Sequence, residues 1–256
     1  MSAPPAVARR TSPEKTRPSV FWVLAAVLVP AIGCFAKIEI SGGEHLPAEG
    51  PYVLAPNHYS EFDPLIIAAA TWRIGRAPRF MAKESLFRVP VLGAALRATG
   101  MVPVARSSTT ATAKLTLAQS VALVEHGRGV IVYPEGSLTR DPDLWPMRGK
   151  TGAVRLALAG DIPVVPVASW GAQRILPRYG KLSLWPPRKR VQVLLGAATD
   201  LSAHRGDAAG ADLVPATDAV MADISDLLGR LRGEQPPAER WDPAAHGQSE
   251  TGRLEP

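Results

Sequence analysis

The sequence predicts an α/β fold in which a mixed, mainly parallel sheet is flanked by helices, with a membrane-associated helix at the N-terminus. Two observations predict this class. Between residues 37 and 232, short apolar runs rich in β-branched residues alternate with helical segments, as in α/β domains. Of the 256 residues, 46% are hydrophobic and 20% are charged, so the chain can bury the core of one such domain.

The two ends of the chain differ from this domain in composition. Residues 1–18 are basic and rich in Pro, Ser and Ala, so we expect a disordered segment. Residues 19–36 form an uncharged apolar run containing Pro30, and we expect a membrane-anchor helix there. A spanning helix, an interfacial or re-entrant anchor, a signal peptide and a buried core helix are the alternatives for this run. Residues 233–256 are polar and Pro-rich and are expected to be a disordered tail.

The domain at residues 37–232 is divided by its hydrophobic pattern into alternating elements. Short apolar runs predict strands at residues 52–55, 80–82, 101–104, 129–133, 164–168 and 191–195. Apolar or amphipathic stretches, several of them bounded by Pro or Gly, predict helices at residues 64–72, 90–98, 112–125, 152–159 and 216–232. In the last of these helices, Val220, Ile224 and Leu227 recur on one face.

The net charge suggests an anionic partner but does not identify which kind of molecule it is. Lys and Arg number 29 against 23 Asp and Glu, which gives a net charge of +6 and a pI near 9.8. A basic surface can meet nucleic acid, anionic lipid or a phosphorylated small molecule. The single cysteine, Cys34, excludes an intramolecular disulfide and a multi-cysteine zinc site. We interpret Cys34 as a small buried apolar residue.

The first candidate catalytic pair is His58 and Asp63, which come just after the strand at residues 52–55. Loops that follow strands in α/β folds commonly carry the chemistry. Positions five apart on a helix are about 140° apart, so the two side chains meet only if His58 precedes the helix. Ser60 and Asp63 form a capping-box pattern that favours this arrangement.

A carboxylate that accepts a hydrogen bond from one imidazole nitrogen fixes the tautomer of the ring. The other nitrogen is then free to take a proton, as a general base must. The alternative is that Asp63 only caps the helix and His58 is an ordinary turn residue.

Two further strand ends carry polar groups. Glu135 and Gly136 follow the strand at residues 129–133, and Arg106 follows the strand at residues 101–104. A glycine permits close approach of a ligand to the backbone, and an arginine can hold a phosphate through two hydrogen bonds. The absence of a Gly-x-Ser-x-Gly turn argues against a covalent hydrolase, and the absence of a glycine-rich phosphate loop argues against nucleotide binding.

Four short blocks in order resemble the 1-acylglycerol-3-phosphate acyltransferase family of glycerolipid acyltransferases. They are Asn57-His58-x4-Asp63, GMVPVAR at residues 100–106, YPEGS at 133–137 and IPVVPV at 162–167. The usual family form of the third block is Phe-Pro-Glu-Gly-Thr-Arg-Ser. Here Leu138 occupies the position of its arginine, and the resemblance implies that either Arg140 or Lys150 supplies that charge.

The resemblance implies the fold of the glycerolipid acyltransferases and an O-acyltransferase activity in phospholipid biosynthesis. A fatty acyl group would pass from acyl-CoA or acyl carrier protein to the hydroxyl of lysophosphatidic acid, without metal, cofactor or nucleic-acid partner. His58 would be the general base and Asp63 its orienting acid. The residues implied to bind the acceptor are Asn57, Arg106, Glu135, Gly136, Arg140 and Lys150.

The resemblance also implies membrane lipids as partners and a place at the cell membrane, with the domain on the cytoplasmic side. The basic run at residues 188–190, preceded by Trp185, is interpreted either as a headgroup contact or as a solvated loop. The alternative functions are an acyltransferase acting on another glycerolipid or a glycolipid, a non-catalytic lipid-binding homologue, and a lipid hydrolase.

Overall fold

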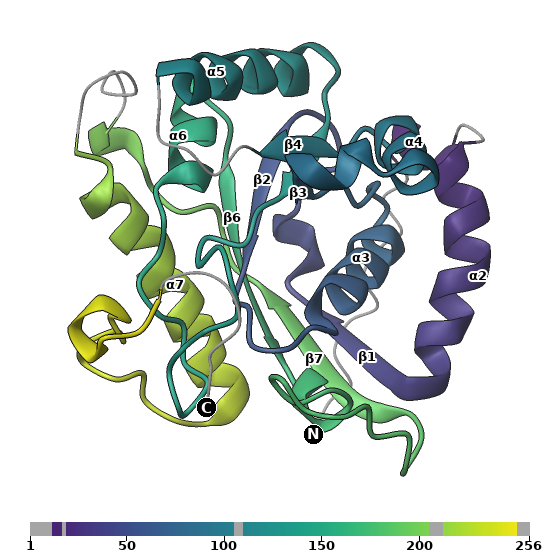
Figure 1. Ribbon diagram of the computed structural model, residues 1–256, viewed down its shortest axis with the longest axis vertical. Helices are drawn as coiled ribbons and strands as arrows, with labels where there is room; N and C mark the ends of the chain where they lie inside the picture. The colour runs from purple at the N-terminus through teal and green to yellow at the C-terminus, as the bar shows by residue number, and fades with distance from the viewer. Residues whose placement is uncertain (1–11, 17–18, 105–109, 205–211, 250–256) are drawn as a thin grey trace.

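The computed structural model describes residues 12–16, 19–104, 110–204 and 212–249. Its centre is a five-stranded sheet in the order β1-β7-β6-β2-β5 (Figure 1). The strands are β1 (Ala36–Ser41), β2 (Tyr52–Pro56), β5 (Gly129–Ile131), β6 (Val164–Trp170) and β7 (Lys189–Leu195). All neighbouring pairs are parallel except β6 and β7, which are antiparallel. The predicted mixed, mainly parallel sheet flanked by helices is therefore confirmed.

Helices cover both faces of this sheet (Figure 1). One face carries α2 (Val20–Phe35) and α3 (Asp63–Ile74), and the other carries α5 (Thr110–Glu125), α6 (Gly152–Ala159) and α7 (Val214–Arg232). A small parallel pair, β3 (Met81–Lys83) and β4 (Val102–Val104), lies beside β5, to which Phe80 forms a bridge. The 3-10 turn η2 (Glu84–Arg88) and helix α4 (Pro90–Ala98) connect β3 to β4.

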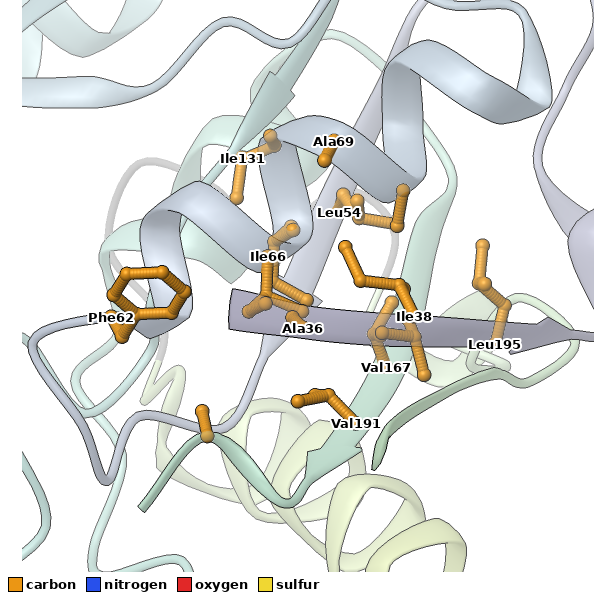
Figure 2. Close-up of a cluster of buried hydrophobic side chains, with 14 of the residues drawn as sticks. Ala36, Ile38, Leu54, Phe62, Ile66, Ala69, Ile131, Val167, Val191 and Leu195 are labelled. Atoms are coloured by element: carbon orange, nitrogen blue, oxygen red, sulfur yellow. The ribbon is translucent and has the colours of Figure 1, made fainter. Parts of the chain in front are cut away.

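The core follows from the alternation of side chains along the central strand β2. Leu54 points into a cluster with α3, which includes Ile66 and is shown in Figure 2. Val53 and Ala55 point into the opposite cluster, with α6 and α7. Because successive side chains of a strand face opposite sides, a strand between two helical layers is apolar throughout. All five residues of β2 are buried, and this strand carries the candidate site at its C-terminal end.

The apolar segment at residues 19–36 does form a helix, α2, which packs on α3. Phe21 and Ile32 are buried on its inner face, and Trp22 meets Trp72 of α3 edge to face at 5.6 Å. Over the described ranges, no helix is both long and apolar enough to cross a membrane. Helix α2 has 16 residues, which reach about 24 Å at 1.5 Å each.

The chain ends differ in part from the disorder expected of them. Residues 12–16 include the helical turn α1 (Pro13–Thr16), and Lys15 Nζ donates to the carbonyl of Trp72 at 2.8 Å. Residues 233–249 follow a defined path along α7, where Arg240 pairs with Asp218 at 3.2 Å. Ion pairs and backbone hydrogen bonds hold these polar segments without a large apolar face. The remaining terminal residues lie outside the described ranges.

The interpretation of Cys34 as a buried residue is wrong, because this cysteine is exposed on α2. Its thiol lies near the carbonyl of Pro30, at 3.5 Å.

Candidate active site

The candidate site begins where β2 ends. His58 lies in the loop between β2 and α3, and Asp63 is the first residue of α3, followed by Pro64. Proline suits the first turn of a helix because its missing N–H has no partner there in any case. The turn therefore places His58 before the helix and Asp63 within it, as the spacing of the two residues requires.

The two side chains meet. Nδ1 of His58 lies 3.1 Å from Oδ2 of Asp63, and the same oxygen accepts hydrogen bonds from the backbone N–H groups of Tyr59 and Ser60, at 2.7 and 2.8 Å. Asp63 is fully buried, whereas the His58 side chain is 17% exposed. The carboxylate thus both closes the turn and orients the ring, so that Nδ1 is the protonated nitrogen and Nε2 carries the lone pair.

The capping box is realised in one direction. Asp63 accepts from the N–H of Ser60, as the motif requires, but the Ser60 hydroxyl accepts from Phe62 N–H at 3.1 Å. The same hydroxyl donates to the carbonyl of Leu176 at 2.6 Å. Ser60 therefore joins the catalytic turn to the segment that follows β6.

The backbone of His58 is held on both sides by the loop after β5. Its N–H donates to Oε1 of Glu135 at 2.8 Å, and its carbonyl accepts from the N–H of Thr139 at 2.7 Å. The second oxygen of Glu135 accepts from the N–H of Met147 at 3.1 Å. Glu135 is fully buried, so its carboxyl group meets the amides of His58 and Met147 and the side chain of Thr139 rather than a surface that an acceptor can reach.

An aromatic residue supports the imidazole ring. The ring of Tyr133 lies 4.2 Å from that of His58, tilted by 30°, and the ring of Phe80 is nearly parallel to that of Tyr133 at 6.5 Å. The Tyr133 hydroxyl is buried and has no hydrogen-bond partner among the described residues. Packing and the Asp63 contact together restrict the ring to one orientation.

Burial dominates the electrostatics of the site. It raises the pKa of Asp63 above its usual value, against the opposing effects of His58 and of the Ser60 and Tyr59 amides. Burial likewise raises the pKa of Glu135 to about 8, although the amides of Met147 and His58 favour its ionised form. It also raises the pKa of Tyr133 well above its usual value, with a smaller contribution from the charge of Asp63.

Two of the predicted binding residues are buried, and their side chains form hydrogen bonds within the protein. Asn57 is 1% exposed and exchanges two hydrogen bonds with the backbone of Ser169, at 3.2 and 2.8 Å, which ties the end of β2 to β6. Arg140 is 2% exposed and donates to the hydroxyl of Tyr179 at 3.0 Å. Neither side chain presents its polar atoms at the surface, so the expectation that they face an acceptor does not match their positions.

Two others lie at the surface beside each other. Gly136 is exposed and has a φ of 70°, a conformation that favours glycine. A Cβ atom at Gly136 would lie 3.1 Å from Cδ and 3.7 Å from Nζ of Lys150, which is partly buried. The backbone N–H of Lys150 donates to the carbonyl of Pro134 at 2.8 Å, so both residues belong to the loop that holds His58. Arg106 lies outside the described residues.

Sequence reasoning did not identify several residues that shape the site. Thr139, Met147 and Ser169 contribute backbone groups, for which side-chain patterns carry no signal. Tyr133 had a signal, because it opens the third block at the position where the family usually has Phe. Arg178 donates to the carbonyls of Thr139 and Asp141 from a loop that no motif marks.

A separate cavity of about 600 Å³ lies at the opposite end of the sheet. It is lined by residues of the segment after β7 and of α7, such as Thr199 and Asp223, and by none of the predicted site residues. The residues predicted to carry the chemistry therefore lie at the end of the sheet that holds His58, away from this cavity. A fixed imidazole with a buried carboxylate behind it can remove a proton from a hydroxyl or a water.

Comparison with known proteins gives this arrangement a family. The model of the family described as Acyltransferase matches residues 37–170, just over half of the chain. The chain belongs to the Acyltransferase family. The match covers the sheet from β1 to β6 and includes His58, Asp63, Glu135 and Lys150.

Two relatives with similar sequences carry the same activity in their names. A chloroplast 1-acyl-sn-glycerol-3-phosphate acyltransferase of Brassica napus is 33% identical over 144 residues, which are 56% of this chain and 40% of that protein. The 1-acyl-sn-glycerol-3-phosphate acyltransferase of Borreliella burgdorferi is 28% identical over 131 residues, 51% of this chain and 50% of that protein. The chain thus spans about half the length, or less, of these relatives.

A solved structure of an acyltransferase has a similar fold. The 1-acyl-sn-glycerophosphate acyltransferase PlsC of Thermotoga maritima superposes with a TM-score of 0.62 over 87% of this chain and 81% of that chain. The two sequences are 20% identical, so this likeness concerns the fold of the acyltransferase domain.

Proposed function

We propose that this acyltransferase moves a fatty acyl group from acyl-CoA or acyl carrier protein to the free hydroxyl of lysophosphatidic acid, a step of phospholipid biosynthesis. The observation that carries the proposal is the 3.1 Å contact between His58 Nδ1 and the buried carboxylate of Asp63. The names of the Brassica and Borreliella relatives support the choice of acceptor.

The reaction needs no covalent enzyme intermediate. Nε2 of His58 takes the proton of the acceptor hydroxyl as its oxygen attacks the thioester carbonyl carbon. The carbon–sulfur bond then breaks, and the leaving thiolate receives that proton from His58. Asp63 stabilises the imidazolium that exists between these two transfers, because its charge lies beside Nδ1.

The phosphate of the acceptor requires a cation near His58. We assign this role to Lys150, which lies against the exposed Gly136 in the loop that holds His58, together with Arg106. Glu135 and Asn57 hold the backbone around His58 in this proposal and do not touch the acceptor.

We further propose that the protein works at the cytoplasmic face of the cell membrane and that α2 lies in the interface. The support is the outer face of α2, where Val23 and Val27 are 68% and 66% exposed. A helix face that exposes several large apolar side chains is typical of contact with lipid or protein.

A panel of acceptors scored by mass spectrometry tests the reaction. The purified protein is incubated with acyl-CoA and, in separate reactions, lysophosphatidic acid, glycerol 3-phosphate, a lysophospholipid with a larger headgroup, or an acylated glycolipid. We expect the acylated product with lysophosphatidic acid and a loss of about 10²–10⁴-fold in a folded His58→Ala variant. Acyl-CoA consumption without an acylated product would instead identify a hydrolase.

A further inference from the structure

The loop at residues 181–187, which leads into β7, exposes large apolar side chains. Trp185 is 82% exposed, the highest value for a large apolar side chain among the described residues, and Leu182 and Leu184 are 50% and 56% exposed. Single exposed apolar residues are common on protein surfaces, but three on one short loop indicate contact with another apolar phase or partner. We call residues 181–187 the tip.

The base of the tip is fastened to the domain. The N–H of Ser183 donates to the carbonyl of Ile175 at 2.7 Å, and Nζ of Lys189 donates to the carbonyl of Ser183 at 2.7 Å. Just after the tip in the sequence, the N–H of Arg188 donates to the carbonyl of Cys34 at 3.1 Å. The apolar side chains are therefore presented from a fixed base that adjoins the C-terminal end of α2.

The charge around the tip has one sign. Residues 171–190 contain six Lys and Arg and no Asp or Glu. Lys181 and Arg188 flank the apolar residues and are exposed. The neighbouring carboxylate of Glu39 is already paired, with Arg190 at 2.7 Å and Lys37 at 3.1 Å. An aromatic anchor between exposed cations complements a bilayer that contains anionic headgroups.

The tip lies at the same end of the sheet as His58. Because β7 is antiparallel to β6, with Trp170 opposite Gln192, β7 begins where β6 and β2 end. Helix α2 runs along the outer edge of the molecule (Figure 1), and β1, which continues from it, begins at this end of the sheet. The contact of Phe35 with Phe62, at 6.4 Å, joins the end of α2 to the start of α3 beside the catalytic turn.

We propose that the tip is a second membrane contact, which inserts Leu182, Leu184 and Trp185 into the interface of an anionic bilayer. Lys181 and Arg188 meet the headgroup phosphates. With α2, the tip gives the protein two points of attachment, which hold the His58 end of the sheet against the lipid surface. The inference rests on the proposed function in one respect, namely that the acceptor is a lipid of that surface.

Co-sedimentation with vesicles tests the attachment directly. The full chain is mixed with vesicles of phosphatidylcholine containing phosphatidylglycerol, and with vesicles of phosphatidylcholine alone. We expect a Leu184→Ser/Trp185→Ser variant to bind the anionic vesicles on the order of tenfold more weakly than the wild type. A Lys181→Glu/Arg188→Glu variant should lose the preference for anionic vesicles. A matched control, Val121→Ser/Val214→Ser, removes two valines of α5 and α7 that are 45% and 42% exposed, and should bind normally.

Acylation measured with two forms of acceptor separates attachment from chemistry. With lysophosphatidic acid presented in anionic vesicles, the Leu184→Ser/Trp185→Ser variant should lose activity in proportion to binding. With a short-chain lysophosphatidic acid below its micelle concentration, it should stay within about twofold of the wild type.

Unchanged vesicle binding by that variant overturns the proposal, and so does an equal loss of activity on both acceptors. If the wild type acylates neither form, the proposed function fails, while the binding experiment still decides the role of the tip.

Discussion

The backbone N–H of His58 lies 2.8 Å from a carboxylate oxygen of Glu135, a residue 77 positions further along the chain. The other oxygen of Glu135 accepts a hydrogen bond from the N–H of Met147. One buried side chain thus joins the loop after β2 to the loop after β5 and fixes the position from which the imidazole works. We therefore propose that Glu135 positions His58, whereas the family resemblance implied that it binds the acceptor.

Replacing Glu135 tests this role through the kinetics. Glu135→Gln keeps one acceptor oxygen but turns an NH2 group toward the other backbone N–H. We expect kcat to fall by about tenfold or more while KM for lysophosphatidic acid changes little, since the acceptor does not touch this side chain. Glu135→Ala should also lower the free energy of unfolding by about 1–3 kcal/mol for each buried amide left without a partner. Steady-state kinetics and denaturant unfolding measure both effects, and a rise in KM at constant kcat would favour direct binding.

The titration of Glu135 predicts a dependence of stability on pH. Burial raises its pKa from the ordinary 4.5 to about 8, so between these values the folded protein retains a proton that the unfolded chain has lost. Stability from this group is therefore complete below about pH 4.5 and is lost as the pH rises through about 8.

The measurement is the free energy of unfolding of the wild type minus that of Glu135→Gln, followed from about pH 5 to about pH 8.5. We expect this difference to decrease with rising pH, by up to a few kcal/mol, because glutamine does not titrate. Asp63 is present in both proteins, so its own titration largely cancels. A difference that stays constant or grows would contradict the raised pKa.

Much of the fold was predictable because its signals are local. The apolar runs of β2 and β6 and the Pro and Gly at the ends of α3 and α6 gave elements that agree with the structure to within a few residues. Strand β1 was not assigned, because its partly exposed sequence continues directly from α2. The antiparallel pairing of β6 with β7 depends on tertiary contacts that no local pattern encodes.

In the candidate site, too, the features set by nearby residues were predictable from the sequence, and those set by distant residues were not. His58 and Asp63 are five residues apart, so their spacing and the helix start between them predicted the geometry of the pair. The positions of Asn57 and Glu135 depend on partners 112 and 77 residues away. The family resemblance made these two polar residues candidates for ligand binding, whereas the structure buries both of them against distant backbone groups.

Lys150 and Arg140 offer a direct comparison of two cations. Lys150→Ala should raise KM for lysophosphatidic acid by about tenfold, because a charge-assisted hydrogen bond to the phosphate is lost, with a smaller change in kcat. Lys150→Arg should retain most of the affinity. Arg140→Gln should instead lower the thermal midpoint, because a buried guanidinium bonded to Tyr179 is removed, and should change KM little. The opposite pattern, with KM sensitive to Arg140 alone, would identify Arg140 as the phosphate ligand.

Substitutions of Tyr133 can distinguish the role of its ring, which supports the imidazole of His58, from that of its buried hydroxyl group. Its ring packs against His58 at 4.2 Å, but its buried hydroxyl has no hydrogen-bond partner among the described residues. A buried hydroxyl without a partner costs about 1–3 kcal/mol, so Tyr133→Phe, which restores the residue usual in the family, should leave stability unchanged or raise it by about 1 kcal/mol. Activity should be retained, because the aromatic face against His58 is preserved. Tyr133→Leu removes that face and should lower kcat, with KM for the acceptor little changed. Thermal unfolding and steady-state kinetics of the two variants decide the matter, and a loss of activity in Tyr133→Phe would show that the hydroxyl itself takes part in the reaction.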